Sequence, residues 1–542
     1  MGYRTIVVDL KSTHPCIPFL KRNTTSSRAV RNTANFLIRN TRSGLRKSPE
    51  ERTHNETEAL HHVFTGLALS NRKKAEHLSN GLREACGSGL AGEAKVRKLL
   101  SSKFFSYPTA EKPFLSYEML DAILKCTGNP CYFACSTQVS QHAIRKTVNS
   151  WKAYSAALKE WRKTPGKFTG KPQPPKYLRE RETTAHFTNQ LAHLRKSEGK
   201  LVLSFANCGE TVSLGRLDVS PSDFVKCEVM PRYGGYRLLL TFPSDSAEPK
   251  VPANPKRVMG IDVGVNNFLA VASNTDMTPF LIDGKWLKSQ NQWFNKRRSL
   301  LISDLTRGKD SQHSCKQSKA LHALSRRRDN LFRDFFYKAA HFICRKAADT
   351  EIEVIVIGNN EGIKQEVDQG RTNNQNFVSI PFERMRNTLT CVAMQYGIPV
   401  VVREESYTSM ASLIDRDAIP TYGSSDQGEI PEFSGSRIKR GLYRSADGYC
   451  LNADVNGAAN IARKEYPHIF DGITDWTFLT KTVLRITRDS LCGVATKKAA
   501  KKPYHRKEAS TTVRYRHETR KARRRSLHAA LGRKKYVHQT AA

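Results

Sequence analysis

The sequence lacks paired cysteines. It contains 12 cysteines, but no two of them have the Cys-x-x-Cys spacing that is typical of thiolate zinc sites. The closest group is Cys126, Cys131 and Cys135, and no histidine follows it at the usual zinc spacing. We therefore interpret these residues as reduced core thiols, and we expect no zinc site.

Long hydrophobic runs are also absent. No stretch approaches the roughly 20 apolar residues that a membrane-spanning helix needs. Residues 1–15 contain no long apolar region and no cleavage signature, so we expect no secretory signal. The basic residues are spread along the chain and do not gather on one amphipathic helix, which disfavours a membrane surface as partner. We expect an intracellular protein: cytoplasmic or at the nucleoid in a prokaryote, nuclear in a eukaryote.

Acidic residues are scarce relative to basic ones. The chain has 542 residues with 89 Lys and Arg against 50 Asp and Glu, which gives a formal net charge of +39. A mixture of charges would be enough for solubility, so this excess predicts a polyanionic partner, most simply nucleic acid. Such binding falls steeply with rising salt, because it releases counterions from the partner.

The first half of the chain changes from a helical to a strand-like texture. Residues 3–9 have the pattern of one strand, and residues 28–105 and 117–164 have the pattern of helices. A proline-rich and basic stretch, 166–181, ends the helical part. Residues 184–246 contain short strand-like runs separated by turn signals, which favours a small barrel or sandwich.

The second half alternates strands with helices. A long helical region at 286–349 is followed by a buried-type strand at 353–358. A helix at 381–396 then leads into a further strand at 398–402. This alternation predicts an α/β core.

An acidic residue stands inside the most strand-like segment of the chain. Asp262 lies within residues 259–273, and a buried carboxylate is costly unless a positive charge lies against it. Glu404 and Glu405 follow another strand, and Asp454 precedes small residues that suit a helix packed close to a sheet. Acids at strand and helix ends of one α/β core could converge on a pair of Mg²⁺ ions.

Each acid also has a purely structural interpretation. Asp262 could face a turn in a β-hairpin, and Asp454 could cap the helix that follows it. Of Glu404 and Glu405, at least one could be solvated. The residues alone leave these alternatives open.

Three sequence motifs together resemble a known family. The segments GIDVGVNNFLAV (260–271), ESYTS (405–409) and NADVNGAANIARK (452–464) are similar to the three RuvC-type motifs of the TnpB family. Members of that family are transposon-associated, RNA-guided DNA endonucleases related to compact type V CRISPR effectors and to Fanzor proteins. The resemblance covers most of residues 1–465, and the motifs occur in the family's order.

The resemblance implies a multidomain α+β fold. It would combine a helical recognition lobe, a small β-barrel wedge domain and a ribonuclease H-like (RuvC) α/β nuclease domain. The implied boundaries are wedge strands at 1–27, the recognition lobe at 28–183, the wedge barrel at 184–250, the nuclease at 251–405 with a helical insertion at 286–349, an insertion at 406–452, the end of the nuclease at 453–495 and a basic, disordered tail at 496–542.

The resemblance also implies the catalytic residues. Asp262 matches the first catalytic acid of the family and Asp454 matches the third. In most of the family the second acid ends the strand that corresponds to 353–358. Gly358 and Asn359 stand there, and neither can be an anionic ligand.

The second acid therefore has to come from elsewhere. Glu361 is close in sequence but lies past the strand end. A subset of the family has moved this acid to the strand before the YTS triplet, which here points to Glu405, with Glu404 as the alternative. The implied metal ligands are then Asp262, Glu405 and Asp454, with two Mg²⁺ ions as cofactors.

A second departure from the family concerns zinc. Relatives carry a zinc ribbon built from two Cys-x-x-Cys pairs between the second and third motifs. Between Ser406 and Asp454 this chain has one cysteine, Cys450. We expect the insertion at 406–452 to fold without zinc.

The function implied by the resemblance is RNA-guided cutting of double-stranded DNA next to a short flanking motif. The partners would be a guide RNA and the target DNA. Two alternatives remain from the sequence. One is a catalytically inactive RNA-guided repressor, and the other is a transposase or accessory nuclease that acts without a guide.

Overall fold

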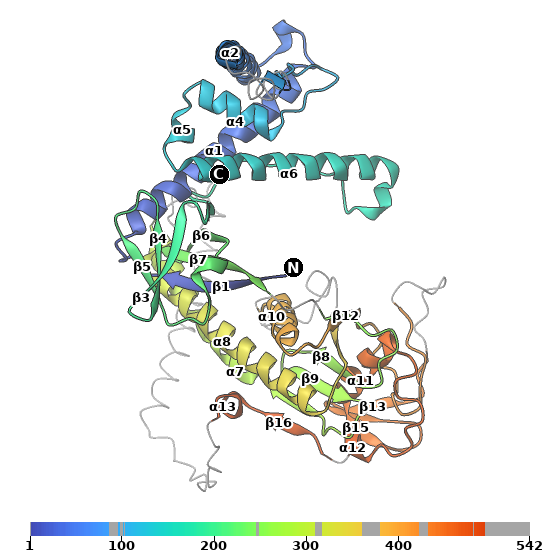
Figure 1. Ribbon diagram of the computed structural model, residues 1–542. Helices are drawn as coiled ribbons and strands as arrows, with labels where there is room; N and C mark the ends of the chain where they lie inside the picture. The colour runs from blue at the N-terminus through green and yellow to red at the C-terminus, as the bar shows by residue number, and fades with distance from the viewer. Residues whose placement is uncertain are drawn as a thin grey trace, which may run out of the picture. The chain divides into compact units, whose positions relative to one another are not determined.

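The computed structural model describes residues 2–85, 96–97, 101, 103–244, 249–308, 317–359, 380–421, 432–480 and 482–493. The expected tail at 496–542 and Glu361 lie outside the described residues. The chain divides into two compact units, residues 1–486 and residues 487–542. The second unit contains the short helix α13 (Arg488–Leu491). Helices and several sheets confirm the expected mixed α+β class (Figure 1).

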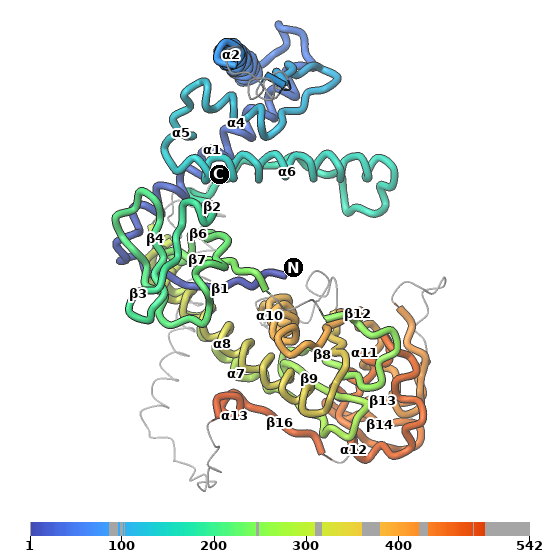
Figure 2. The backbone as a smooth tube through the Cα atoms, in the orientation of Figure 1, coloured from blue at the N-terminus to red at the C-terminus, as the bar shows by residue number. Residues whose placement is uncertain are grey.

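The N-terminal part of the chain contains one strand and a group of helices. Figure 2 follows this part of the backbone from its blue end. The elements are β1 (Gly2–Leu10), α1 (Ile17–Gly44), the 3-10 turn η1 (Pro49–Glu51), α2 (His54–Ala85), α4 (Tyr117–Cys126), α5 (Pro130–Phe133), α6 (Thr137–Lys163) and the 3-10 turn η2 (Pro165–Lys167).

Helix α1 begins earlier than the sequence pattern suggested. Its first residue is Ile17, so the second half of the segment expected as wedge strands at 1–27 is helical. Proline near the start suits the first turn of a helix, because that turn leaves its N–H groups without intrahelical partners. Phe19 and Leu20 then pack into the core of the neighbouring sheets, and this tertiary burial outweighs the polar local sequence.

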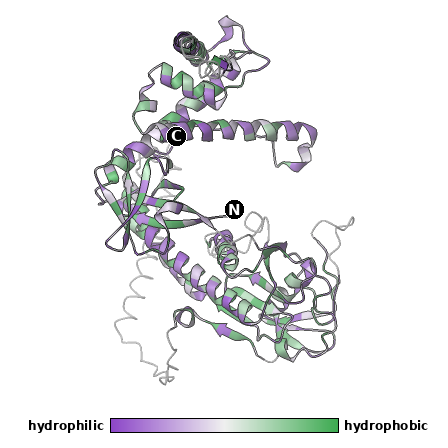
Figure 3. Cartoon of the chain, viewed as in Figure 1, coloured by the Kyte–Doolittle hydropathy of each residue, from purple (hydrophilic) through white to green (hydrophobic). Residues whose placement is uncertain are grey.

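The helical part has a core of its own. Apolar side chains from α1, α2, α4, α5 and α6 form one buried cluster. Trp151 is buried within it, and its indole Nε1 donates a hydrogen bond to Asn35 Oδ1 at 2.8 Å. Both hydrophilic and hydrophobic residues run along the helices (Figure 3), as expected for helices that bury one stripe and expose the rest.

Two antiparallel sheets follow the helices in sequence. One has the order β1-β7-β6-β2, and the other has the order β3-β4-β5. Strand β1 pairs with β7 along its whole length, from Gly2 opposite Ser244 to Leu10 opposite Tyr236. The bounds are β2 (Ala185–Thr188), β3 (Ala192–Ser197), β4 (Lys200–Phe205), β5 (Thr211–Gly215), η3 (Pro221–Asp223), β6 (Lys226–Arg232) and β7 (Gly235–Ser244).

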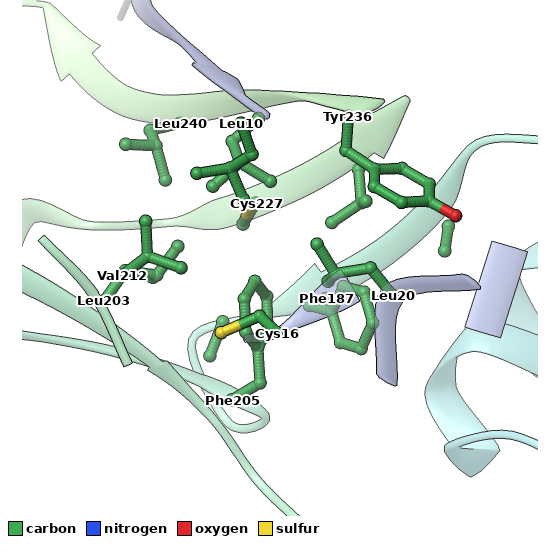
Figure 4. Packing of buried hydrophobic residues seen from close by; sticks show 14 of the residues in the cluster. Leu10, Cys16, Leu20, Phe187, Leu203, Phe205, Val212, Cys227, Tyr236 and Leu240 are labelled. Carbon is green, nitrogen blue, oxygen red and sulfur yellow. The ribbon is translucent and has the colours of Figure 1, made fainter. Parts of the chain in front are cut away.

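The two sheets share one core with the start of α1. Figure 4 shows Leu20 from the helix among Phe187, Phe205 and Leu240 from the strands. The N-terminal strand and the start of the first long helix are therefore tied to strands that lie about 200 residues later in the sequence.

A six-stranded mixed sheet forms the C-terminal part. Its order is β12-β11-β8-β9-β10-β16, with β8, β11 and β12 parallel to one another and β9 antiparallel to β8. The strands are β8 (Val258–Val263), β9 (Asn267–Ser273), β10 (Phe280–Asp283), β11 (Val354–Asn359), β12 (Val400–Glu404) and β16 (Leu484–Ile486). The helices are α7 (Lys285–Thr306), α8 (Lys319–Asp349), α10 (Phe382–Gln395), α11 (Ala453–Glu465) and α12 (Thr477–Thr480).

Helix α11 lies directly on the central strand β8. A Cβ atom at Gly260 would be 1.9 Å from the carbonyl oxygen of Ala458, so only glycine permits this approach. The small residues Ala458, Ala459 and Ala462 of α11 are fully buried in the same cluster. The sequence of β8 and α11 thus fixes how the start of this helix meets the sheet.

The insertion between β12 and α11 contains a three-stranded antiparallel sheet, β13 (Ser436–Lys439), β14 (Leu442–Arg444) and β15 (Cys450–Asn452). Two aspartates hold it together. Asp417 accepts from Ser412 N at 2.7 Å and from Ser434 Oγ at 2.6 Å, and Asp415 accepts from Ala446 N at 2.8 Å. Carboxylates that bind backbone N–H groups thus connect the loops of this insertion.

Candidate active site

The structure places Asp262 at the carboxyl end of β8. Its neighbour Ile261 pairs with Ile357 of the parallel strand β11, and Asp262 itself lies opposite Ala270 of β9. Strands β8, β11 and β12 are parallel, so their carboxyl ends meet at one edge of the sheet. This is the edge at which open α/β sheets bind ligands.

Helix α11 brings Asp454 to the same edge. A Cβ atom at Gly457 would lie 3.5 Å from Asp262 Oδ2, so the beginning of α11 is next to the Asp262 carboxylate. The cap of this helix is Asn452, whose Oδ1 accepts from Asp454 N at 3.0 Å and from Val455 N at 3.3 Å. The structural interpretation of Asp454 as the helix cap is therefore wrong.

The side chain of Asp454 makes a different contact. Its Oδ2 accepts a hydrogen bond from Asn267 Nδ2 at the start of β9. Asn267 Oδ1 in turn accepts from Arg485 Nη1 at 3.3 Å. A carboxylate in the first turn of a helix is also favoured by the positive end of the helix dipole. The Asp454 carboxylate is thus held in place from the sheet side.

Glu404, the last residue of β12, has a buried cationic partner. Its Oε2 lies 2.6 Å from Lys464 Nζ of α11, and its Oε1 accepts from Ser406 N at 2.6 Å. Burial alone would raise the pKa of Glu404, but the hydrogen bonds from Lys464 and Ser406 and the charge of Lys464 outweigh it and lower this pKa. The Glu404 carboxylate is therefore engaged in a structural ion pair.

Glu405 lies against the end of β11. A Cβ atom at Gly358 would be 2.5 Å from Glu405 Oε2 and 3.5 Å from Glu405 Cβ. The Glu405 side chain therefore occupies the volume that a side chain at position 358 would need. Glu405, the residue after β12, therefore reaches the end of β11, which is where the resemblance implies the second acid in most of the family.

The three acids interact through their charges. Burial raises the pKa of Asp262, and the negative charges of Glu405 and Asp454 raise it further, to about 7. A hydrogen bond from the backbone of Val263 and the charge of Arg437 act in the opposite direction but are outweighed. Like charges gathered at a crowded position are unfavourable, unless a cation lies between them.

The donor chemistry of these acids suits a hard divalent cation, because Mg²⁺ prefers carboxylate oxygen ligands. Within the described ranges, no group of three or more His, Cys, Asp and Glu side chains is arranged so that it could hold a metal ion. The three carboxylates thus share one edge and one electrostatic environment without forming a closed ligand set.

The roles of three residues at this edge were not predicted from the sequence. Asn267 holds Asp454, and Gly260 and Gly358 make room for α11 and for Glu405. The signals for them were the Asn-Asn pair at 266–267, within the first motif, and a glycine where an acid was expected. Both become informative only when the pairing of β8, β9 and β11 is known.

Not all basic residues are available to a nucleic acid. Arg39 Nη2 donates to the carbonyl oxygen of Pro175 at 2.5 Å, and Arg28 Nε donates to that of Leu178 at 3.4 Å. Arg237 is buried against Asp9 and Asp329. Part of the positive charge therefore holds the chain together.

Among the helices of the described residues, none combines the length and the apolar character needed to cross a bilayer.

Comparison with known proteins bears on one part of the chain directly. Residues 241–364 match the family OrfB_IS605, which is described as a probable transposase. This segment contains β8 with Asp262 and β11 with Gly358. The resemblance to the TnpB family is thereby confirmed. No curated protein matches the chain.

Several solved structures are similar to the chain at low identity. A Cas12f1–sgRNA–target DNA complex is 15% identical over 74% of this chain and 82% of that chain, with a TM-score of 0.41. CasPhi-2 (Cas12j) bound to crRNA is 10% identical over 68% of this chain and 93% of that chain, with a TM-score of 0.31. C2c1 of Alicyclobacillus acidoterrestris with single-guide RNA is 10% identical, covers 82% of this chain and 70% of that chain, and has a TM-score of 0.28.

Proposed function

We propose that the protein is an RNA-guided DNA endonuclease with a metal-dependent, RuvC-type active site. The observation that carries the proposal is the meeting of Asp262, Glu405 and Asp454 at one edge of the mixed sheet. The three carboxylates come from β8, from the residue after β12 and from α11. Their negative charges repel one another at that edge, as the ligands of a cation site do before the ion is bound.

The topology supports a ribonuclease H-like domain. Strands β8, β9 and β10 form an antiparallel meander, β11 and β12 add in parallel on the side of β8, and α11 packs on the central strands. We assign the nuclease to residues 251–405 and 453–495, with 286–349 and 406–452 as insertions. Strand β1 with residues 184–250 would form the wedge domain, and 28–183 the recognition lobe.

In the proposed reaction, Asp262, Glu405 and Asp454 would hold two Mg²⁺ ions, which would supply the activation of water and the stabilisation of the leaving oxygen in phosphodiester hydrolysis. Asn267 keeps the Asp454 carboxylate turned toward the sheet edge. Gly358 leaves the volume that the Glu405 carboxylate fills. Glu404 takes no part as a ligand, because Lys464 and Ser406 N engage its carboxylate.

The remaining parts of the proposal concern nucleic acid. The net charge of +39 supports a partner with a phosphate backbone. In this assignment the guide RNA reads the target DNA by base pairing, and the protein holds the heteroduplex by its shape and backbone. A short DNA motif beside the target would be read by the wedge and recognition parts. The protein would act inside the cell and without zinc.

The test begins with the RNA that accompanies the protein. The full chain is purified at moderate salt, the bound RNA is sequenced, and cleavage of a DNA library with matching targets is measured with Mg²⁺ and with EDTA. One defined RNA with a variable end, together with Mg²⁺-dependent cleavage of matching DNA, is the expected result. Random cellular RNA and no guided cleavage would overturn the proposal.

Two other functions have specific support. The matched family is described as a probable transposase, which favours a nuclease that acts on transposon ends without a guide. That function predicts cleavage or strand joining at such ends in the absence of RNA. An RNA-guided repressor predicts tight guided binding with no cleavage. The glycine at position 358 favours this second alternative, and the position of Glu405 beside it argues against it.

A further inference from the structure

Helix α11 carries three buried polar side chains on one stripe. Asn456, Asn460 and Lys464 are spaced four residues apart, so they lie on the same side of the helix. The exposed fractions of the whole residues are 0%, 0% and 8%. Lysine is rarely buried unless it is paired, so the burial of Lys464 needs an explanation in terms of its partners.

All three side chains bind one short segment of the chain, residues 404–413. Asn456 Nδ2 donates to Ala411 O at 2.8 Å, and Asn460 Nδ2 donates to Thr408 O at 2.9 Å. Lys464 Nζ donates to Glu404 Oε2 at 2.6 Å and to Ser406 O at 2.8 Å. The contacts of Lys464 therefore lie on both sides of Glu405.

Lys464 holds the chain on both sides of Glu405. Its Nζ binds the Glu404 carboxylate and the carbonyl oxygen of Ser406, so both neighbours of Glu405 are tied to α11. The Glu405 Oε2 lies against the Cβ position of Gly358, which also faces Ile461 of α11. Asp454 is on the same helix, about 15 Å of helix axis before Lys464. One rigid element thus carries one proposed ligand and orients another.

We propose that Lys464 is a positioning residue that aims Glu405 at the metal site, with Glu404 as its anchor. This inference rests on the proposed function, because it assigns Lys464 a role toward the proposed Mg²⁺ ligands. It also explains why two glutamates follow each other at the end of β12. One of them is the anchor, and the other is the ligand.

The chain provides a matched control. Arg403 Nη1 and Glu465 Oε2, 3.5 Å apart, connect the same two elements, β12 and α11, at positions next to Glu404 and Lys464. The Arg403 side chain is 39% exposed, whereas that of Lys464 is 2% exposed. The substitution Glu465→Gln therefore removes an ion pair between β12 and α11 without removing the Lys464 contact.

The experiment uses the full chain freed of RNA and measures binding of Mn²⁺ as a Mg²⁺ probe by electron paramagnetic resonance. The wild type is compared with Lys464→Met, Glu404→Gln, Glu465→Gln and Asp262→Asn. We expect Lys464→Met to weaken Mn²⁺ binding by about 10-fold to 100-fold, the usual effect of removing a group that orients a ligand. Glu404→Gln should weaken it less, and Glu465→Gln should leave it unchanged. Guided cleavage should need a correspondingly higher Mn²⁺ concentration, with an unchanged KM for DNA.

The outcomes separate this inference from the proposed function. Normal Mn²⁺ binding by a folded Lys464→Met protein would overturn the positioning role but leave the nuclease assignment standing. Loss of binding in Glu404→Gln equal to that in Asp262→Asn would make Glu404 a ligand and would also overturn it. No Mn²⁺ binding by the wild type would remove the proposed metal site itself. If Lys464→Met does not fold, Glu404→Gln and Lys464→Arg provide the same comparison.

Discussion

Glu405 and Gly358 share one volume at the edge of the mixed sheet: a Cβ atom on Gly358 would lie 2.5 Å from Glu405 Oε2. The two residues belong to different segments, but β11 and β12 are parallel neighbours and bring their ends together. A carboxylate can therefore reach this place from either strand. The absence of an acid at positions 358 and 359, at the end of β11, is thus compatible with a complete set of three acids.

The first prediction concerns Gly358. In Gly358→Ala the new methyl group collides with the Glu405 carboxylate, so guided cleavage should fall by about 100-fold, as expected for a ligand displaced by about 1 Å. The double substitution Gly358→Asp with Glu405→Ala should recover part of the activity that Glu405→Ala loses. Cleavage rates at saturating RNA measure both effects. Gly209, which has open space around its Cβ position, provides the control as Gly209→Ala.

The second prediction concerns the charge of Asp262. Asp262→Asn removes one of three mutually repelling carboxylates, so the metal-free protein should melt at a higher temperature than the wild type. Added Mg²⁺ should raise the melting temperature of the wild type and change that of the variant little. Guided cleavage should be abolished while RNA binding stays unchanged. Thermal melts with and without Mg²⁺ check this, with the exposed Asp276→Asn as control.

A lower melting temperature for metal-free Asp262→Asn would contradict this interpretation. It would mean that the Asp262 carboxylate is stabilised by protein contacts, and not destabilised by burial and by its acidic neighbours. In that case the edge would be a structural cluster rather than a cation site.

The sequence alone was sufficient for several elements around the acids, because their apolar patterns are local. The strand at 353–358 and the helix at 381–396 correspond to β11 and α10. The start of α1 at Ile17 could not be predicted, since it depends on packing against strands about 200 residues away. That Glu404 is engaged in an ion pair while Glu405 lies against Gly358 could not be predicted, because the partner of Glu404 is Lys464, 60 residues further along the chain.

The third prediction concerns a buried ion network. Asp329 of α8 binds Arg232 of β6 at 3.0 Å and Arg237 of β7 at 3.2 Å, and it also pairs with Arg384 of α10. Burial raises the pKa of Asp329, but these three arginines outweigh it and lower that pKa. Asp329→Ala leaves the arginines without their shared partner, so the free energy of unfolding should fall by roughly 3–5 kcal/mol.

Urea unfolding followed by circular dichroism measures this loss. Asp334 of the same helix forms an exposed pair with Lys338, and Asp334→Asn should change the free energy of unfolding by less than about 1 kcal/mol. Equal losses for the two variants would show that burial of the Asp329 network adds nothing to stability.

The fourth prediction concerns acid stability. His142 of α6 and His186 of β2 have ring centroids 3.5 Å apart. Burial lowers the pKa of His142 to about 4, helped by the charge of Lys146, and burial and the charge of His142 lower the pKa of His186 to about 3. Glu228 acts in the opposite direction on both. Both imidazoles therefore stay neutral in the folded protein at pH values where they are protonated in the unfolded chain.

The sign of the pH effect follows from these pKa values. Below the unfolded pKa of 6.5 the unfolded state binds more protons than the folded state. Stability from this pair should be fully present above pH 6.5 and should decrease as the pH falls toward about 4 and about 3. The substitution His186→Phe should flatten the acid limb of the melting temperature against pH. The exposed His468→Gln should leave that limb unchanged.

The fifth prediction concerns zinc. Asp417 accepts hydrogen bonds from Ser412 N and from Ser434 N and Oγ, so a carboxylate connects the loops of the insertion for which the sequence predicts no zinc site. A zinc-selective chelator in excess Mg²⁺ should then change neither guided cleavage nor the melting temperature. Asp417→Ala should lower the melting temperature, because it leaves these donors without their acceptor. Asp447→Asn, at an exposed position of the same insertion, should have little effect. Loss of activity with the chelator, restored by added zinc, would show that the insertion binds a metal after all.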